Sequence, residues 1–400
     1  MGRFVSLLFA GAAFCAATFS VAYAAGTSTL EINPQRDSTY ALPSDPQGAM
    51  EAARELVAAG DLEGAIRGLS RYVAGHPGEI MPARLLGDLY YRRGDLGRAE
   101  AQYKAILALV PRDKETHNRL GSVYATQNRI EDAIDEFNRS LPGTDSVPDL
   151  VKLHMRKGDF SVYMAERERA AREYPTDPEW QLELGQVYEA VHRPDLAILY
   201  FRRALDQDPS SLFALNGLGL AFLDEDQYDS AIEDFQTCLR HDQYYYACAD
   251  NLGAAYLESK RFAGAGSILA FAHKLQPERS EALVNLGYLA DANGDWKKAV
   301  SYYIQAMTVY PYSPDSYIDL GYTYTVHGLY QLAQSALVKG LAVAPGDGRL
   351  HFLLGDAYAR QGNQSLAEMQ FRAAATSDDP DVKRLAQERV AALEGNSIRP

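Results

Sequence analysis

The sequence predicts an all-α protein, a solenoid of about ten helix-turn-helix repeats with a C-terminal capping helix. Three observations lead to this prediction. A Leu-Gly pair recurs through the chain every 34 residues, apart from one step of 64. Apolar residues within each unit follow the helical period. Glycine marks the middle of most units and proline the end of many, where helices are expected to stop.

Residues 1–24 are typical of a secretory signal peptide. Arg3 precedes a long apolar run, and Ala22-Tyr23-Ala24 has the small-x-small pattern of a cleavage site. The alternative is an uncleaved membrane anchor, because the apolar stretch is long enough to span a bilayer. We therefore expect an exported protein, periplasmic or extracellular, or else one anchored in the membrane by its N-terminal segment. Residues 25–45 contain turn formers without a helical period, which predicts a flexible linker.

Two columns of small residues define the repeats in residues 46–381. The first column consists of the glycines that follow leucine: Gly87, Gly121, Gly185, Gly219, Gly253, Gly287, Gly321 and Gly355. The second column, twelve residues later in each unit, consists of alanines. Small side chains on both helices let the axes of an antiparallel pair approach closely, so the cost of each glycine to its helix has a packing explanation.

Two regions depart from the regular pattern. Residues 144–177 carry Val151 and Tyr163 where glycine and alanine are expected, which predicts a looser helix pair or a bend. A divergent but complete repeat is the alternative. After the last unit, residues 382–395 form an amphipathic pattern that ends at Gly395, which predicts the capping helix that a solenoid needs over its last apolar face. Residues 396–400 are expected to form a short tail after this helix.

The repeat resembles the tetratricopeptide repeat family. The residues that carry the resemblance are the Leu-Gly pair, an aromatic residue three positions after the glycine, the alanine column and the closing prolines. The resemblance implies a right-handed solenoid in which the first helix of each hairpin lines a concave groove. It also implies a protein that binds other proteins or peptides.

Composition and motifs argue against other classes of function. The net charge of −14 disfavours a nucleic-acid partner, because affinity for phosphates depends on clustered lysine and arginine. The chain has no phosphate-binding loop, no nucleophile elbow and no pair of histidines at metal-ligand spacing. We therefore expect no catalytic residues, no metal and no cofactor.

Cys238 and Cys248 are the two cysteines that remain after the predicted cleavage. Export permits a disulfide between them, provided that their Cα atoms lie within about 7 Å. Cys238 also stands in a column that other units fill with alanine, so a small, buried core residue is the alternative.

Candidate partner-binding residues lie one position after the repeat glycine and two or three positions before it. In the last repeats these positions gather apolar, aromatic and amide side chains, and such a cluster, where it is exposed, often marks a binding surface. In relatives of this fold, asparagines on this surface hold a peptide backbone. Packing against neighbouring helices is the alternative for the whole set. The candidates for the concave groove are Asn251, Val284, Asn285, Tyr288, Ile318, Tyr322 and Phe352.

The sequence thus predicts a non-catalytic interaction scaffold that binds an extended peptide or a partner helix. By analogy, its setting would be a cell-envelope assembly or secretion system. A self-assembling structural protein, and hence a homo-oligomer, is a second hypothesis. An enzyme of unrecognised type is the third. Membrane contact is expected only if the N-terminal segment is uncleaved.

Overall fold

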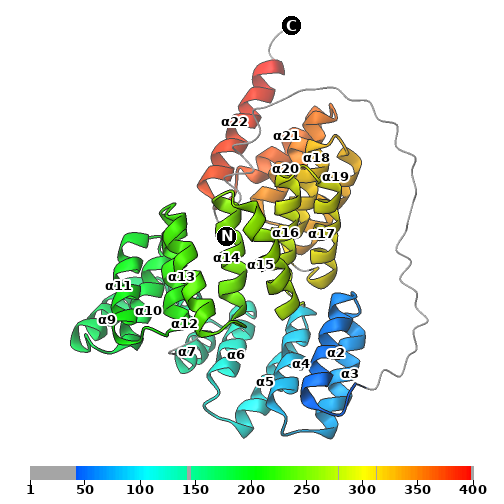
Figure 1. The fold of residues 1–400 in the computed structure, drawn as a ribbon. Helices are drawn as coiled ribbons and strands as arrows, with labels where there is room; N and C mark the ends of the chain where they lie inside the picture. Colours follow the sequence, from blue (N-terminus) through cyan, green and yellow to red (C-terminus); the bar gives the residue numbers. More distant parts are fainter. Residues whose placement is uncertain (1–41, 142–145, 278, 312, 398–400) are drawn as a thin grey trace. The chain divides into compact units, whose positions relative to one another are not determined.

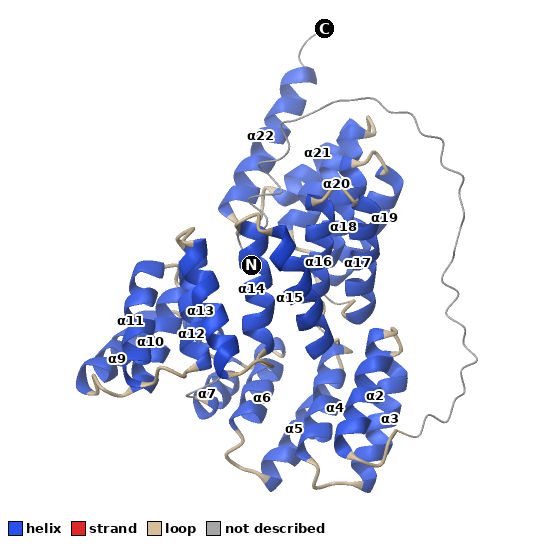
Figure 2. Cartoon of the chain, in the orientation of Figure 1, coloured by secondary structure: helices blue, strands red, loops and turns tan. Residues whose placement is uncertain are grey.

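The computed structural model describes residues 42–141, 146–277, 279–311 and 313–397. Within these ranges every regular element is a helix (Figures 1 and 2). The bounds are α2 Pro46–Ala58, α3 Leu62–Gly75, α4 Ile80–Arg92, α5 Leu96–Leu109, α6 Lys114–Thr126, α7 Ile130–Ser140, α8 Val147–Lys157, α9 Phe160–Glu173, α10 Pro178–Ala190, α11 Pro194–Gln207, α12 Leu212–Asp224, α13 Tyr228–His241, α14 Tyr246–Glu258, α15 Phe262–Leu275, α16 Glu281–Ala292, α17 Trp296–Val309, α18 Pro314–Val326, α19 Tyr330–Val343, α20 Gly348–Arg360, α21 Gln364–Ala374 and α22 Pro380–Ser397.

Successive helices pair as hairpins, and each pair packs on the next along the chain (Figure 1). The first helix of most units begins seven residues before its repeat glycine, for example at Ile80 of α4 and Tyr246 of α14. The predicted boundary between Gly143 and Thr144 lies outside the described residues. The all-α solenoid predicted from the repeat is confirmed.

The predicted signal peptide and most of the predicted linker also lie outside the described residues. Residues 42–45, the end of that linker, are not free of the fold. The Leu42 side chain packs beside α3, and the Asp45 carboxylate accepts a hydrogen bond of 2.7 Å from the backbone N–H of Gly48 at the start of α2. Among the helices of residues 42–397, none has the length and apolarity to cross a membrane.

The repeat glycines face one large side chain on the second helix of their own pair. A Cβ atom added to Gly287 would lie 2.4 Å from the Tyr303 ring, and one added to Gly121 would lie 2.7 Å from the Phe137 ring. In two units leucine takes the place of the ring, as in Gly253 against Leu269. These distances are too short for carbon atoms in contact, so any side chain larger than hydrogen would displace the partner residue.

The turn inside each hairpin requires a left-handed backbone. Glycine supplies it in most units, as at Gly94 with φ 79°. His192 and Lys260, which are poor residues for this conformation, nevertheless adopt it with φ 58° and 59°. The repeat register therefore sets the turn conformation even where the local sequence disfavours it.

The pair α8 and α9 departs from the others, as the sequence predicts. Val151 and Tyr163 are both buried, and α8 contacts α9 much less than the helices of the other pairs contact each other. The Tyr163 ring instead stacks on His154, with ring centroids 4.4 Å apart. The looser packing follows from the larger side chains; a bend at this point stays a prediction.

The C-terminal helix α22 packs on α20 and α21 and buries Val382 and Ala386. It is longer than predicted at both ends. It begins at Pro380 and continues past Gly395 to Ser397, so the prediction that Gly395 ends the helix is wrong. A single glycine lowers helix stability by only about 1 kcal/mol, which does not oblige a helix to end.

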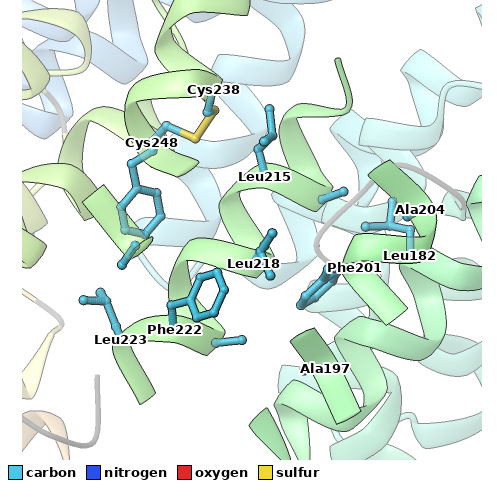
Figure 3. Close-up of a cluster of buried hydrophobic side chains, with 14 of the residues drawn as sticks. Leu182, Ala197, Phe201, Ala204, Leu215, Leu218, Phe222, Leu223, Cys238 and Cys248 are labelled. Atoms are coloured by element: carbon cyan, nitrogen blue, oxygen red, sulfur yellow. A yellow bond between two sulfur atoms is a disulfide. The ribbon is translucent and has the colours of Figure 1, made fainter. Parts of the chain in front are cut away.

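Cys238 of α13 and Cys248 of α14 form a disulfide, with Cα atoms 6.4 Å apart. Both side chains are fully buried in the cluster that also contains Leu215 and Leu218 of α12 (Figure 3). Both interpretations of Cys238 therefore hold, since it fills a core position and also forms the bond.

The contact between Gly287 and Tyr303 predicts the sign of a mutational effect. Gly287→Ala improves helix propensity, but its Cβ atom would overlap the Tyr303 ring, so we expect a loss of about 1–3 kcal/mol in the free energy of unfolding. In a Tyr303→Ala background the same change should be neutral or stabilising by up to about 1 kcal/mol. Denaturant unfolding of the four proteins in this cycle measures both effects.

Gly97 provides the matched control. It lies in the first turn of α5, where an added Cβ atom meets no atom within 4 Å. Gly97→Ala should therefore stabilise the protein or leave it unchanged. If Gly287→Ala stabilises the wild-type protein, the Tyr303 ring does not require the absence of a side chain at position 287, and the packing explanation is wrong.

Candidate functional site

The candidate residues come from the first helices of the later pairs, α14, α16, α18 and α20. Each of these helices is held by the contact between its glycine and the following helix, so residues at equal distances from the glycine lie in corresponding places. The structure brings Asn251, Val284, Asn285, Tyr288 and Tyr322 to partly exposed positions on α14, α16 and α18. We call these five residues together with Asp319 the candidate face.

Hydrogen bonds between neighbouring first helices form a short ladder across the candidate face. Asn251 Nδ2 donates to Asn216 Oδ1 of α12 over 2.8 Å, and Asn285 Nδ2 donates to Asp250 Oδ1 of α14 over 3.1 Å. In both rungs the donor stands two residues before its repeat glycine and the acceptor three residues before the previous one. The amide oxygens of Asn251 and Asn285 accept no hydrogen bond from the described residues, so each keeps an acceptor for a ligand.

Tyr288 and Tyr322 stand one residue after their repeat glycines on adjacent first helices. Each is half-buried. Tyr288 packs against the cluster that contains Leu257 and Leu269 of the preceding pair, and Tyr322 packs against the cluster that contains Ile318 and Leu337. Val284, one turn before Tyr288, is also half-buried and packs beside Leu283 and Tyr303. The candidate face thus offers apolar and aromatic surface next to amide groups.

Ile318 and Phe352 do not belong to this face, which corrects the prediction. Ile318 is 3% exposed within the cluster that contains Leu337 and Leu350. Phe352 is 5% exposed, and its ring centroid lies 5.4 Å from that of Phe371. The C-terminal pairs pack closely enough to cover these positions, so packing, which the sequence left as an alternative, holds for both residues.

Asp319 is a residue of this face that the sequence analysis missed. It stands two residues before its repeat glycine, as Asn251 and Asn285 do, and is 8% exposed. The spacing of the ladder places Asp319 opposite Val284, whose side chain has no polar atom. No hydrogen bond from the described residues reaches its carboxylate. The sequence does contain a signal for this. Two residues before the repeat glycine, Asn285 of one unit is followed by Asp319 of the next, while three residues before the glycine Asp250 is followed by Val284.

Burial raises the pKa of three carboxyl groups around this face. It raises the pKa of Asp319 to about 8, and the neighbouring Asp315 charge adds to the rise while Arg349 opposes it. It raises the pKa of Asp250 to about 6, although the hydrogen bond from Asn285 lowers it. It also raises the pKa of Asp291, whose carboxylate accepts hydrogen bonds of 3.1 Å from Tyr303 and Thr323.

The corresponding positions of the early repeats are occupied by internal ion pairs. Arg84 of α4 binds Asp113 through two hydrogen bonds of 2.8 Å. Arg119 of α6 stands in the same column as Asp319 and lies 2.8 Å from Glu115 and 3.3 Å from Asp88. Charged groups at these positions are thus paired within the protein, which Asp319 is not.

No metal centre is evident in the part of the chain that the structure describes, where no three His, Cys, Asp or Glu side chains gather closely enough to hold an ion. His117 has its own partners, Glu136 at 2.5 Å and the Pro111 carbonyl at 3.0 Å. This contact joins α6 to α7, so we assign His117 a structural role.

Comparison with known proteins gives matches to one repeat family and to several solved structures. A family model described as tetratricopeptide repeat matches residues 84–148, 149–211, 182–246 and 318–382, and a second model with this description matches residues 282–311. Two similar solved structures are those of the APC/C hetero-tetramer Cut9-Hcn1 and of yeast Tom70. The first is 18% identical with a TM-score of 0.48 and covers 86% of this chain and 83% of its own. The second is 12% identical with a TM-score of 0.48, and the match covers 88% of this chain and 96% of Tom70.

MamA, a shorter protein, is also similar to part of the chain. It is 24% identical with a TM-score of 0.35, and the match covers 40% of this chain and 95% of MamA.

The buried Asp319 carboxyl predicts a dependence of stability on pH. The pKa of Asp319 is about 8 in the folded protein and near the usual value for aspartate when unfolded, so between these values only the folded state holds the proton. Raising the pH from 5 to 8 should therefore lower the melting temperature, and the raised pKa of Asp250 adds to this below pH 6. Asp319→Asn should make this decline smaller, and the difference in the free energy of unfolding can reach about 1.4 kcal/mol per pH unit.

The control for this experiment is Asp206→Asn, at an exposed position on α11. It should keep the full decline between pH 5 and pH 8. Equal slopes for the wild type and Asp319→Asn would contradict the assignment of the buried proton to Asp319.

Proposed function

Because the chain belongs to the tetratricopeptide repeat family, we propose that it is a non-catalytic scaffold that binds other proteins. The proposed ligand is an extended peptide, or one face of a partner helix, lying along α14, α16 and α18. The observation that carries the proposal is the candidate face itself, where two half-exposed tyrosines stand beside amide groups with free acceptors.

The chemistry of this face suits a peptide. An asparagine oxygen can accept a hydrogen bond from a backbone N–H, and two such oxygens stand on neighbouring helices, at Asn251 and Asn285. Tyr288 and Tyr322 offer large amphipathic surfaces that lose little conformational entropy on binding, because each is already packed by one side. Backbone contacts would provide affinity, and the tyrosines would select apolar side chains.

The proposed setting is an exported one, such as a cell-envelope assembly or secretion system. Its first support is the N-terminal sequence pattern of residues 1–24. A second support is the bond between Cys238 and Cys248, because disulfides persist in oxidising compartments and are rare in the cytosol. The particular system rests on family analogy alone.

Self-assembly is a second candidate function. It is favoured by apolar side chains on α19 that are half exposed, Leu332 at 50% and Val338 at 51%. A molar mass that rises with concentration in light scattering would favour it, and a strict monomer across dilution would count against it.

A displayed library of random peptides tests peptide binding. The mature chain should select peptides that share a pattern, and Tyr288→Glu/Tyr322→Glu should bind them at least about tenfold more weakly, because two charges replace the aromatic contacts. The matched control is Tyr174→Glu/Tyr244→Glu, which makes the same changes at exposed tyrosines away from the candidate face. Circular dichroism and the melting temperature establish that each variant is folded.

If both double variants bind the selected peptides as the wild type does, the candidate face is not the binding site. If the folded wild type selects no peptide pattern, the proposal of peptide binding is itself wrong.

A further inference from the structure

We propose, on the basis of the proposed function, that the candidate face takes a peptide carrying lysine or arginine, whose cationic head group pairs with the Asp319 carboxylate. The stem of that side chain would lie against Tyr288 and Tyr322. Asp319 is then the residue that determines the charge of the ligand.

The first argument is the interrupted hydrogen-bond ladder. Asn251 bonds to Asn216, and Asn285 bonds to Asp250, each 35 residues earlier in the chain. The residue 35 positions before Asp319 is Val284, which cannot continue the ladder. The residue at the end of the ladder is thus only 8% exposed, and its carboxylate has no hydrogen-bond donor among the described residues. A carboxyl group with so little access to water gains more from a hydrogen bond to a ligand than an exposed one does.

The second argument is the local charge. The charges of Asp315 and Asp291 both act on Asp319, and among the described residues Arg349 is the cation that opposes them. The Arg349 guanidinium is already bound, at 3.0 Å to Asp315 and at 2.6 Å to Asp347. Carboxylates therefore outnumber cations around Asp319, and a cationic ligand is complementary to this surface while an acidic one is repelled.

The third argument is the aromatic surroundings. Tyr322 stands three residues after Asp319 on α18, so the two side chains lie on one face of that helix, and the Asp319 charge also acts on Tyr288 of the neighbouring first helix α16. An ammonium or guanidinium group is attracted both by a carboxylate and by the face of an aromatic ring. The chain itself uses this combination elsewhere, with Arg279 paired to Glu281 and 4.6 Å from the centre of the Tyr246 ring.

The test uses the mature chain and the displayed peptide library. Peptides selected by the wild type should be enriched in lysine or arginine at one position next to an apolar residue. A selected peptide is then synthesised with lysine and with norleucine, its uncharged analogue, at that position. Fluorescence anisotropy should show that the norleucine peptide binds the wild type at least about tenfold more weakly, as expected for the loss of a charged hydrogen bond.

Two variants remove the proposed pairing in different ways. Asp319→Asn keeps the shape but cannot lose a proton to become the carboxylate that pairs with the cationic head group, a step that binding of the cation itself favours in the wild type. Val284→Asn keeps Asp319 but gives it an amide partner inside the protein, which continues the ladder. In both variants the preference for the lysine peptide should fall to about twofold or less. Asp206→Asn should keep the full preference.

The outcomes separate this proposal from the proposed function. A wild type that selects peptides without a cationic position, or whose lysine preference survives Asp319→Asn in a folded protein, overturns the role of Asp319 and leaves peptide binding intact. Selection of acidic residues also overturns it. A wild type that selects no peptide overturns both.

Discussion

The fold depends on one repeated contact, in which a glycine on the first helix of a pair receives a large side chain from the second. Gly287 against Tyr303 and Gly355 against Phe371 are two examples, and neither leaves room for a Cβ atom. The contact sets the distance between the two helices and the rotation of the first helix about its axis. Residues next to the glycine therefore face the same way in each unit, and function can be placed on them without altering the core.

The candidate face shows what small changes in these positions do. Where the two side chains that face each other from neighbouring first helices are both polar, as with Asn285 and Asp250, they form a hydrogen bond. Where both are apolar, as expected for Leu353 and Ile318, they pack and are buried. Asp319 opposite Val284 is the mixed case, and it leaves a carboxylate without a donor. The boundary between the polar and apolar parts of the solenoid is thus where a ligand has most to contribute.

The sequence was sufficient to predict the helical hairpins, because one column of glycines gives the register of nearly every helix. It was less informative about which residues form the candidate face. The positions beside the glycine could be named, but whether a neighbouring helix covers them depends on how closely adjacent pairs pack, which no local pattern expresses. Ile318 and Phe352 were misplaced for this reason. The bond between Cys238 and Cys248 likewise depended on a distance across a turn, and α22 continues through Gly395, which the sequence pattern had marked as its end.

The location of binding on the first helices can be measured most directly by amide hydrogen exchange with and without a selected peptide. Binding to the candidate face should slow exchange in α14, α16 and α18 and leave α4 and α6 unchanged, because only the former carry the proposed contacts. Slower exchange confined to second helices such as α15, α17 and α19, or to the early repeats, would contradict the assignment of the binding site to the candidate face.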